Sequence, residues 1–251
     1  MEIGFKIHRI KSCFSTNDLA KELAEKKKVE QGEVVVCDEQ TKGRGTQGRK
    51  WYSVPDKGLY FSVILFPLRS DLSLLPLTAS LAIREAVFRN LNILIHLKWP
   101  NDLVYKGIKL GGILCESSFS GLKLNYSIIG IGINVKHKED DFLDELKRNA
   151  VSLEMIYKRD IDKRKFLSDL FVPLEKWYQI FLRNEDEKIL DEYMDACTYH
   201  MGDSLKAMVR GKPVSGLFQG LDKQGRIILN INEQEERFLS GEIRITEKSG
   251  D

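Results

Sequence analysis

A glycine-rich loop lies between two strand-like runs, and this order limits the folds open to the chain. Residues 41–51 read TKGRGTQGRKW, with the β-branched run 33–37 before them and the apolar run 58–66 after them. A dinucleotide-binding G-x-G-x-x-G loop would instead open a helix, and a P-loop would continue with Lys and then Ser or Thr. The pattern fits neither. It leaves two interpretations, an anion-binding loop and a solvated surface loop.

The order of the other elements is typical of an α+β fold and not of a doubly wound parallel sheet. Strands are predicted at 5–10, 33–37, 58–66, 93–99, 103–105, 108–117 and 124–135. Polar caps at 15–18 begin a first helix, and residues 71–91 and 162–197 are also predicted to be helical. Beyond residue 200, five short strands with glycine turns indicate a small barrel-like module. We therefore predict two domains, residues 1–200 and residues 201–251.

The composition limits the partners and the compartment. The 39 basic and 37 acidic side chains give a net charge of +2. A charge this small argues against a protein that binds nucleic acid over its whole surface. The four cysteines are scattered without a C-x-x-C pair, as expected for reduced thiols in a cytoplasmic protein. The four histidines are equally dispersed and predict no zinc site. No apolar stretch in the sequence is long enough to span a membrane.

Four further segments carry polar residues or glycines where a purely structural role is hard to explain. They are STN at 15–17, KWPND at 98–102, KLGGIL at 109–114 and GIGIN at 130–134. Taken singly, each has a structural interpretation, such as a helix cap or a turn. Glycines on two strands, however, clear a flat space above a sheet, and Lys109 at its edge would neutralise a carboxylate. The segments predict a pocket for a flat ligand with a charged tail, beside an anion site.

In combination, these segments resemble one family. GRGTQGRKW, KWPNDL, K-LGGILCE and GIGINV follow STN in the order found in biotin protein ligases, the biotin–[acetyl-CoA-carboxylase] ligases. The resemblance covers essentially the whole chain and includes SGEI at 240–243. It implies an α+β domain with a mixed sheet and flanking helices, related to class II synthetases, and an SH3-like C-terminal β-barrel.

The resemblance also implies an activity. Such enzymes make biotinyl-5′-AMP from biotin and ATP with Mg²⁺, and then transfer biotin to one lysine of a biotin carboxyl carrier protein. No tightly bound metal, DNA or membrane partner is expected, and a homodimer is possible. Some relatives carry an N-terminal DNA-binding domain, whereas here Ser15 lies close to Met1, so we expect the non-repressor class.

Site residues follow from the same resemblance, position by position. The biotin-binding set is Ser15, Thr16, Asn17, Gln40, Gly43, Arg44, Gly45, Lys109, Gly111, Gly112, Gly130 and Gly132. The ATP and adenylate set is Arg49, Trp51, Lys98, Asn101, Lys109 and Asn134, with Trp51 expected to stack on adenine. Lys109, Asp102 and Arg49 are the expected catalytic residues, and Asp102 would assist the incoming lysine amine. Thr46 stands where many relatives have Arg, which predicts weaker retention of the adenylate.

Three alternatives remain open at this stage. A lipoate ligase shares the fold and the adenylation chemistry, although the GRGTQGRKW and KWPND segments favour biotin. A phosphate- or nucleic-acid-binding module is compatible with the basic loop and the terminal β module. A non-catalytic relative is disfavoured because Lys109 and Asp102 are both present.

Overall fold

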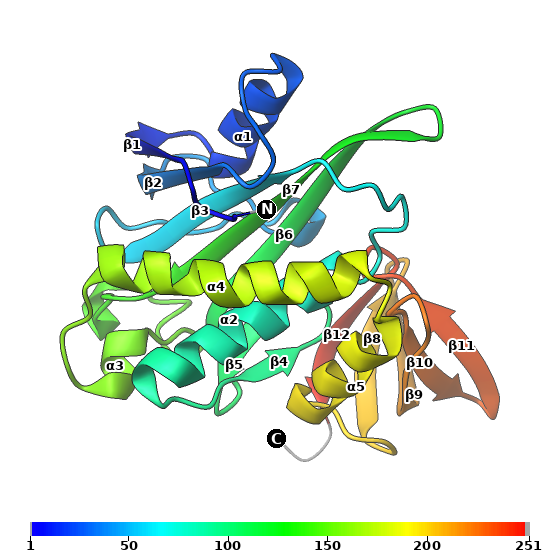
Figure 1. The fold of residues 1–251 in the computed structure, drawn as a ribbon. Coiled ribbons are helices and arrows are strands. Elements are labelled where there is room, and N and C mark those ends of the chain that lie inside the picture. The colour runs from blue at the N-terminus through cyan, green and yellow to red at the C-terminus, as the bar shows by residue number, and fades with distance from the viewer. Residues whose placement is uncertain (1, 249–251) are drawn as a thin grey trace.

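The computed structural model describes residues 2–248, and its centre is a seven-stranded mixed sheet (Figure 1). The strands are β1 (Ile7–Cys13), β2 (Val34–Gln40), β3 (Gly58–Leu65), β4 (His96–Lys98), β5 (Asp102–Tyr105), β6 (Ile108–Ser120) and β7 (Lys123–Asn134). Their order in the sheet is β1-β2-β3-β7-β6-β5-β4. Only the β1–β2 pair is parallel among the described strands. Antiparallel neighbours on both sides hold β6 and β7 at the middle.

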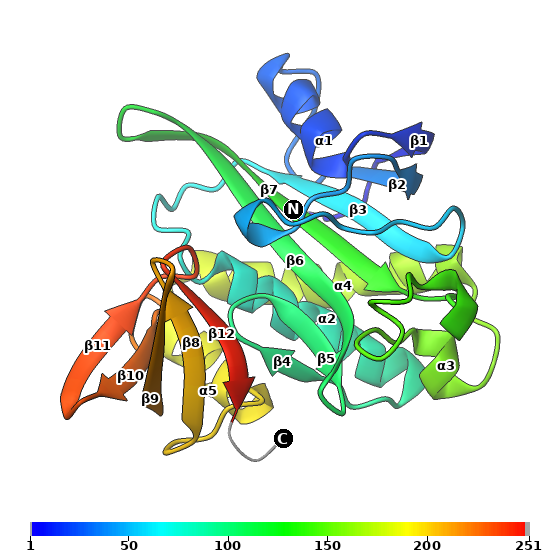
Figure 2. The same cartoon turned by 180° about the vertical axis from the view of Figure 1, so that it is seen from behind.

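Helices cover the two faces of this sheet unequally. They are α1 (Thr16–Glu25), α2 (Leu75–Leu91), α3 (Leu153–Tyr157), α4 (Lys163–Leu182) and α5 (Asp186–Ala196). On β7, Ile129 and Ile131 belong to the large core beneath α2 and α4, whereas Ile128 packs in the small cluster under α1. Because side chains alternate along a strand, Gly130 and Gly132 face the α1 side. Beyond α1 that side is crossed by loops, as the view from behind shows (Figure 2).

A second sheet follows at the C-terminal end. It contains β8 (Ser204–Val209), β9 (Lys212–Leu221), β10 (Ile227–Ile231), β11 (Gln234–Phe238) and β12 (Ile243–Lys248), in the order β11-β10-β9-β8-β12. The Trp99 indole Nε1 donates to the Gly225 carbonyl at 2.9 Å, and Thr198 N donates to Leu97 O, also at 2.9 Å. The first bond fastens the β9–β10 turn of the second sheet against the β4–β5 edge of the first, and the second bond attaches the segment after α5 to β4. The predicted α+β class, with a large mixed sheet and a small terminal β module, is confirmed.

Some element boundaries differ from those predicted. The helix predicted from residue 71 begins at Leu75, with Pro76 in the first turn, where its missing N–H costs no hydrogen bond. The helical stretch 162–197 is two helices separated at 183–185. Asp162 caps the first of them, because its carboxylate accepts from Arg164 N and Lys165 N. Helix α3 and the short 3₁₀ turns Thr46–Gly48 and Glu139–Asp141 were not predicted.

Candidate active site

A cavity of about 280 Å³ opens on the α1 side of the central sheet, over β6 and β7. Its lining comes from the start of α1, the end of β2, the glycine-rich loop, the β4–β5 turn, the two central strands and residues 142–150. The lining residues are Ser15, Thr16, Asn17, Gln40, Arg44, Gly45, Thr46, Arg49, Lys50, Trp51, Tyr52, Asn101, Lys109, Gly112, Ile113, Leu114, Gly130, Ile131, Gly132, Asn134, Phe142, Leu146, Asn149 and Ala150. The five sequence segments therefore converge on one hollow.

Glycines form the part of the cavity floor where the Trp51 indole and the Asn17 amide approach the sheet. A Cβ on Gly132 would lie 2.8 Å from the Trp51 indole atoms Cε2 and Cζ2, and a Cβ on Gly112 would lie 3.3 Å from Cζ3. A Cβ on Gly130 would lie 2.2 Å from the Asn17 Oδ1 atom. Side chains at these positions would therefore displace the indole ring or the amide.

An ion pair stands at one edge of the cavity. The Lys109 ammonium lies 2.6 Å from Asp102 Oδ1, and it is 5.6 Å from the centre of the Trp51 ring. Lys98 is directly opposite Asp102 across the β4–β5 hairpin, which places the two residues on the same face. Both members of the ion pair keep some exposure, so the ammonium remains available to an anion in the cavity.

Polar groups at the start of α1 are held by one another. Gln40 Oε1 accepts from Thr16 N at 2.8 Å and from Thr16 Oγ1 at 3.1 Å. The Ser62 hydroxyl, fully buried on β3, lies 2.7 Å from Thr16 Oγ1 and 2.6 Å from Asn17 Oδ1. Asn17 Nδ2 donates to Leu114 O and to Glu116. The α1 terminus thus presents a fixed set of polar side chains to the cavity.

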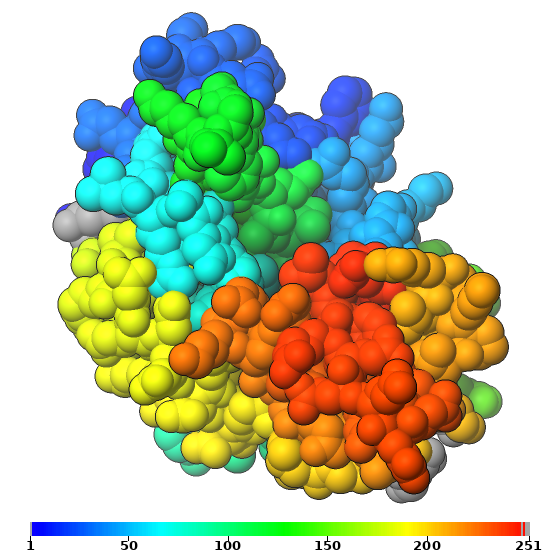
Figure 3. Space-filling view, turned by 90° about the vertical axis from the view of Figure 1, so that its right-hand side faces the viewer, coloured from blue at the N-terminus to red at the C-terminus, as the bar shows by residue number. Residues whose placement is uncertain are grey.

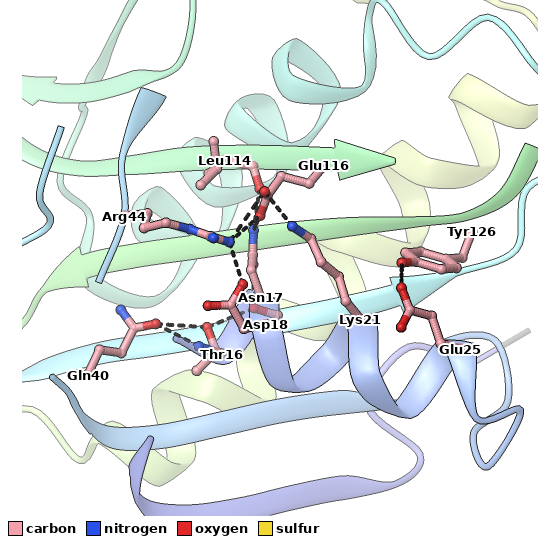
Figure 4. A network of polar contacts seen from close by, with 11 residues as sticks. Thr16, Asn17, Asp18, Lys21, Glu25, Gln40, Arg44, Leu114, Glu116 and Tyr126 are labelled. Atoms are coloured by element: carbon pink, nitrogen blue, oxygen red, sulfur yellow. Dashed lines mark hydrogen bonds and ion pairs between the residues drawn. The ribbon is translucent and has the colours of Figure 1, made fainter. Parts of the chain in front are cut away.

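Glu116 is the hub of a charged cluster beside this terminus (Figure 4). Its carboxylate receives hydrogen bonds from Asn17 at 2.7 Å, Lys21 at 2.5 Å and Arg44 at 3.1 Å. Arg44 also reaches Asp18 Oδ1 at 2.6 Å. Burial alone would raise the pKa of the Glu116 carboxyl, but the bonds from Lys21 and Asn17 and the charges of Lys21 and Arg44 hold that pKa below its ordinary value. Arg44 therefore ties the glycine-rich loop to α1 and β6.

The loop itself closes as a small hairpin. Gly45 N donates to Arg49 O at 2.7 Å, and Trp51 N donates to Gly43 O at 2.9 Å. The Arg49 guanidinium donates to the Thr46 hydroxyl at 3.0 Å and to the Thr46 carbonyl at 3.3 Å. Thr46 thus helps to orient Arg49 at the cavity wall. The effect of Thr46 on adenylate retention stays a prediction.

The buried side-chain amides of Asn101 and Asn134 brace another part of the cavity wall. Asn101 Nδ2 donates to Ile113 O at 2.7 Å, which pins the β4–β5 turn to β6. Asn134 Nδ2 donates to Val151 O at 3.2 Å, which attaches the chain after η2 (Glu139–Asp141) to the end of β7. Phe142 lines this wall, and the buried His137 ring stacks behind it with 5.0 Å between ring centres.

Comparison with known proteins identifies the family. Residues 10–134 match the biotin/lipoate A/B protein ligase family, and residues 206–245 match the biotin protein ligase C-terminal domain. The bifunctional ligase/repressor BirA of Bacillus subtilis is 32% identical over 236 residues, which cover 92% of this chain and 71% of that protein. The chain belongs to the biotin protein ligase family.

Other members of the biotin protein ligase family agree in sequence and in fold. The biotin–[acetyl-CoA-carboxylase] ligase of Paracoccus denitrificans is 30% identical, covering 78% of this chain and 82% of that one. The structure of the Aquifex aeolicus biotin protein ligase in complex with biotin and ATP superposes with a TM-score of 0.82. That match has 30% identity and covers 96% of this chain and 99% of the other.

Four of the residues predicted from the family resemblance do not line the cavity. Gly43 is buried at the loop base, where a Cβ would lie 2.7 Å from Trp51 O. Gly111 points to the core, where a Cβ would meet the Leu103 side chain at 3.1 Å. Asp102 contacts Lys109 at the edge of the cavity, and Lys98 pairs with Asp102 across the β4–β5 hairpin. The ligand-binding and catalytic roles of all the predicted residues stay predictions.

The structure also adds residues that the sequence analysis did not single out. Ser62 lies within an apolar strand run, and Glu116 follows the glycines of β6 on the same strand. The wall formed by Phe142, Leu146, Asn149 and Ala150 has no sequence pattern of its own. Among residues 2–248, no group of three His, Cys, Asp or Glu side chains is arranged to hold a metal ion. Within the same range, no helix is long and apolar enough to cross a membrane.

The buried His137 imidazole, which stacks on Phe142, predicts that the stability of the folded protein depends on pH. Burial lowers the pKa of the imidazole from 6.5 to about 4, the Asp141 charge opposes this shift, and Lys57 and Lys163 add to it. The folded state thus disfavours a proton that the unfolded chain accepts. We expect the stability conferred by neutral His137 to be complete above pH 6.5 and to fall as the pH drops towards 4, by on the order of 3 kcal/mol.

Urea unfolding between pH 7 and pH 4.5 measures this effect, with the His137→Asn variant as the control. The variant keeps every other titrating group, so its loss of stability over this range should be smaller than that of the parent by roughly 2–3 kcal/mol. Parallel pH profiles for the two proteins would show that His137 is not the titrating group.

Proposed function

We propose that this protein activates biotin with ATP to form biotinyl-5′-AMP and then transfers biotin to one lysine of a biotin carboxyl carrier protein. The observation that carries the proposal is the glycine-floored cavity with the Lys109–Asp102 pair at its edge, in a chain of this family. The match of residues 206–245 to the biotin protein ligase C-terminal domain favours biotin over lipoate. We assign residues 1–200 to the catalytic domain and residues 201–251 to the C-terminal domain.

The first half-reaction joins two anions. The biotin carboxylate attacks the α-phosphorus of ATP, a new O–P bond forms, and pyrophosphate leaves with the electrons of the broken P–O bond. Lys109 lines the cavity. It would lie between the two reactants and offset the negative charge that builds up at the phosphorus. Arg49 and Lys50 line the same cavity and would act on the phosphates. Mg²⁺ would enter bound to ATP, as part of the substrate.

The second half-reaction needs a neutral amine. The carrier lysine attacks the acyl carbon of biotinyl-5′-AMP, an amide bond forms, and AMP leaves with the electrons of the acyl–oxygen bond. The attacking nitrogen must lose a proton, and Asp102 at the cavity edge is a suitable acceptor. Asp102 also holds Lys109 at 2.6 Å, so it would position the cation of the first step.

Polar side chains at the start of α1 would bind the ureido ring of biotin, and Trp51 with the Phe142 wall would enclose the adenosine part. Homodimer formation and a cytoplasmic location stay predictions.

A substrate comparison tests the function directly. The purified protein should catalyse exchange of labelled pyrophosphate into ATP with biotin and not with lipoate. Addition of a carrier domain should then raise the carrier mass by one biotinyl group. Exchange with lipoate alone would contradict the proposal.

Lys109→Ala should abolish most adenylate formation. The substitution removes the charge that meets the developing charge at phosphorus, which should cost about 3 kcal/mol or more, or over roughly a hundredfold in rate. The matched control is Lys106→Ala, since Lys106 is exposed on the same hairpin and stands over the Tyr105 ring outside this cavity. Pyrophosphate exchange at the parental rate in the Lys109 variant would contradict the assignment.

Asp102→Asn should separate the two half-reactions. Asparagine keeps an oxygen that can accept the Lys109 hydrogen bond, but it cannot take a proton from the carrier amine. In single-turnover assays we expect biotinyl-5′-AMP to accumulate, because transfer slows more than adenylation. Asp102→Ala removes both functions and should impair both steps. Equal losses in the Asn variant would mean that Asp102 acts only through the position of Lys109.

A further inference from the structure

The tip of the glycine-rich loop contacts the C-terminal sheet. Gln47 Nε2 donates to the Ser240 carbonyl at 3.1 Å and lies 3.5 Å from the Ile243 carbonyl, across 193 and 196 residues of chain. The light-blue part of the chain that includes the loop lies directly above the orange and red C-terminal module (Figure 3). Both N–H groups of one side-chain amide can thus be directed at the second domain.

The acceptors on the C-terminal side belong to a well-defined turn. Glu242 N donates to Leu239 O at 3.0 Å, and Leu239 N donates back to the Glu242 carboxylate at 3.0 Å. Arg210 reaches the same carboxylate at 3.2 Å. The turn is therefore braced at both ends and joined to the β8–β9 hairpin. Its carbonyls occupy fixed positions relative to the module.

The module in turn has a fixed position beside the cavity. Trp99 Nε1 donates to Gly225 O, and Trp99 precedes Asp102 by only three residues in the sequence. A Cβ on Gly225 would lie 2.8 Å from the Leu74 side chain and 2.9 Å from the Leu77 side chain, so this turn packs closely on the start of α2. A loop attached to the module is therefore attached to the same framework that carries Asp102.

On the loop side, Gln47 lies between residues that face the cavity. It stands inside the 3₁₀ turn with φ 56° and ψ 35°, next to Thr46 and two residues before Arg49. Arg49 is bonded to Thr46 by its guanidinium and to Gly45 through its carbonyl. At its other end the loop is tied to α1 and β6 by Arg44. Without the Gln47 contact, the described hydrogen bonds of the half that carries Arg49 would all be internal to the loop. Its remaining anchor would be the Trp51 ring, which packs on the sheet two residues beyond Arg49.

We propose that Gln47 is a positioning residue that couples the C-terminal domain to the glycine-rich loop and holds Arg49 against bound ATP. This inference rests on the proposed function. It assigns the C-terminal domain a role in ATP binding during adenylate formation. Gln47 is exposed and does not line the cavity, so it acts through the loop and not on the ligand. Because Arg44 holds the biotin end independently, loss of the contact should affect ATP more than biotin.

The test compares three variants with the parent. Gln47→Met keeps the length of the side chain and removes its donors, whereas Gln47→Lys keeps donors of similar reach. Gln234→Met makes the same chemical change on the exposed strand β11 and serves as the control. The measurements are KM for ATP and for biotin in pyrophosphate exchange, the rate of cleavage after Arg44 and Arg49 by an arginine-specific protease, and Tm.

We expect Gln47→Met to raise KM for ATP roughly three- to tenfold, the range of one or two neutral hydrogen bonds. Loop cleavage should accelerate by a similar factor, while KM for biotin and Tm change little. Gln47→Lys should restore most of the parental behaviour, and Gln234→Met should match the parent throughout.

An unchanged KM for ATP and an unchanged cleavage rate in Gln47→Met would overturn the proposal. An equal rise in Gln47→Lys would also overturn it, because the donor would then be irrelevant. If the parent shows no biotin-dependent exchange, the proposed function fails, and the cleavage rates of the ligand-free proteins still decide whether Gln47 holds the loop.

Discussion

The site depends on the absence of side chains at three positions of two neighbouring strands. Gly130 and Gly132 let the Asn17 amide and the Trp51 indole lie against the sheet at distances that a Cβ would forbid, and a Cβ on Gly112 would crowd the same indole. Glycine weakens a strand, because it packs nothing and loses more conformational freedom on folding. Here β6 and β7 are the central strands of the antiparallel ladder, and the opposite face of β7 buries isoleucines beneath α2 and α4. The neighbouring strands and the core on the opposite face therefore offset the destabilisation that the glycines cause.

Charges then organise the groups around that floor. At one end, Glu116 gathers Asn17, Lys21 and Arg44, so the α1 terminus and the glycine-rich loop share a single carboxylate. At the other end, Asp102 holds the Lys109 ammonium at 2.6 Å at the edge of the cavity. A carboxylate thus holds each of two cavity-lining cations, Arg44 and Lys109, and cations fixed in this way need less reorganisation when they meet an anion. Gln47 adds a neutral link from the same loop to the second sheet.

Contiguous stretches account for what the sequence could predict. Residues that are neighbours on one strand or in one loop are also close in space. Several site residues therefore lie together in each of three segments, GRGTQGRKW, KLGGIL and GIGIN. For this reason the sequence and its family resemblance could predict Lys109, Trp51 and the cavity-lining glycines as parts of one pocket. Alternation along β6 also explains why Gly111 faces the core while Gly112 faces the cavity, a distinction that needs the register of β5 and β6.

Contacts between distant segments account for what the sequence could not predict. Ser62 is a hydroxyl in an apolar run, and its role appears only when β3 passes beneath α1. Phe142 enters the wall through an irregular segment without periodicity. The Gln47 contact joins residues 193 positions apart. Both partners belong to segments that carry the family resemblance, but neither segment shows by itself that the two meet.

Biotin binding by Gly132→Ala, measured by titration calorimetry, is the most direct test of the glycine floor. The added methyl would lie 2.8 Å from the Trp51 ring, so the ring must move into the cavity. Overpacking of this kind costs about 1–3 kcal/mol, which predicts biotin affinity roughly five- to a hundredfold weaker. Ile129→Val alters the opposite face of the same strand and should leave biotin affinity unchanged. A folded Gly132→Ala protein that binds biotin as tightly as the parent would contradict the account.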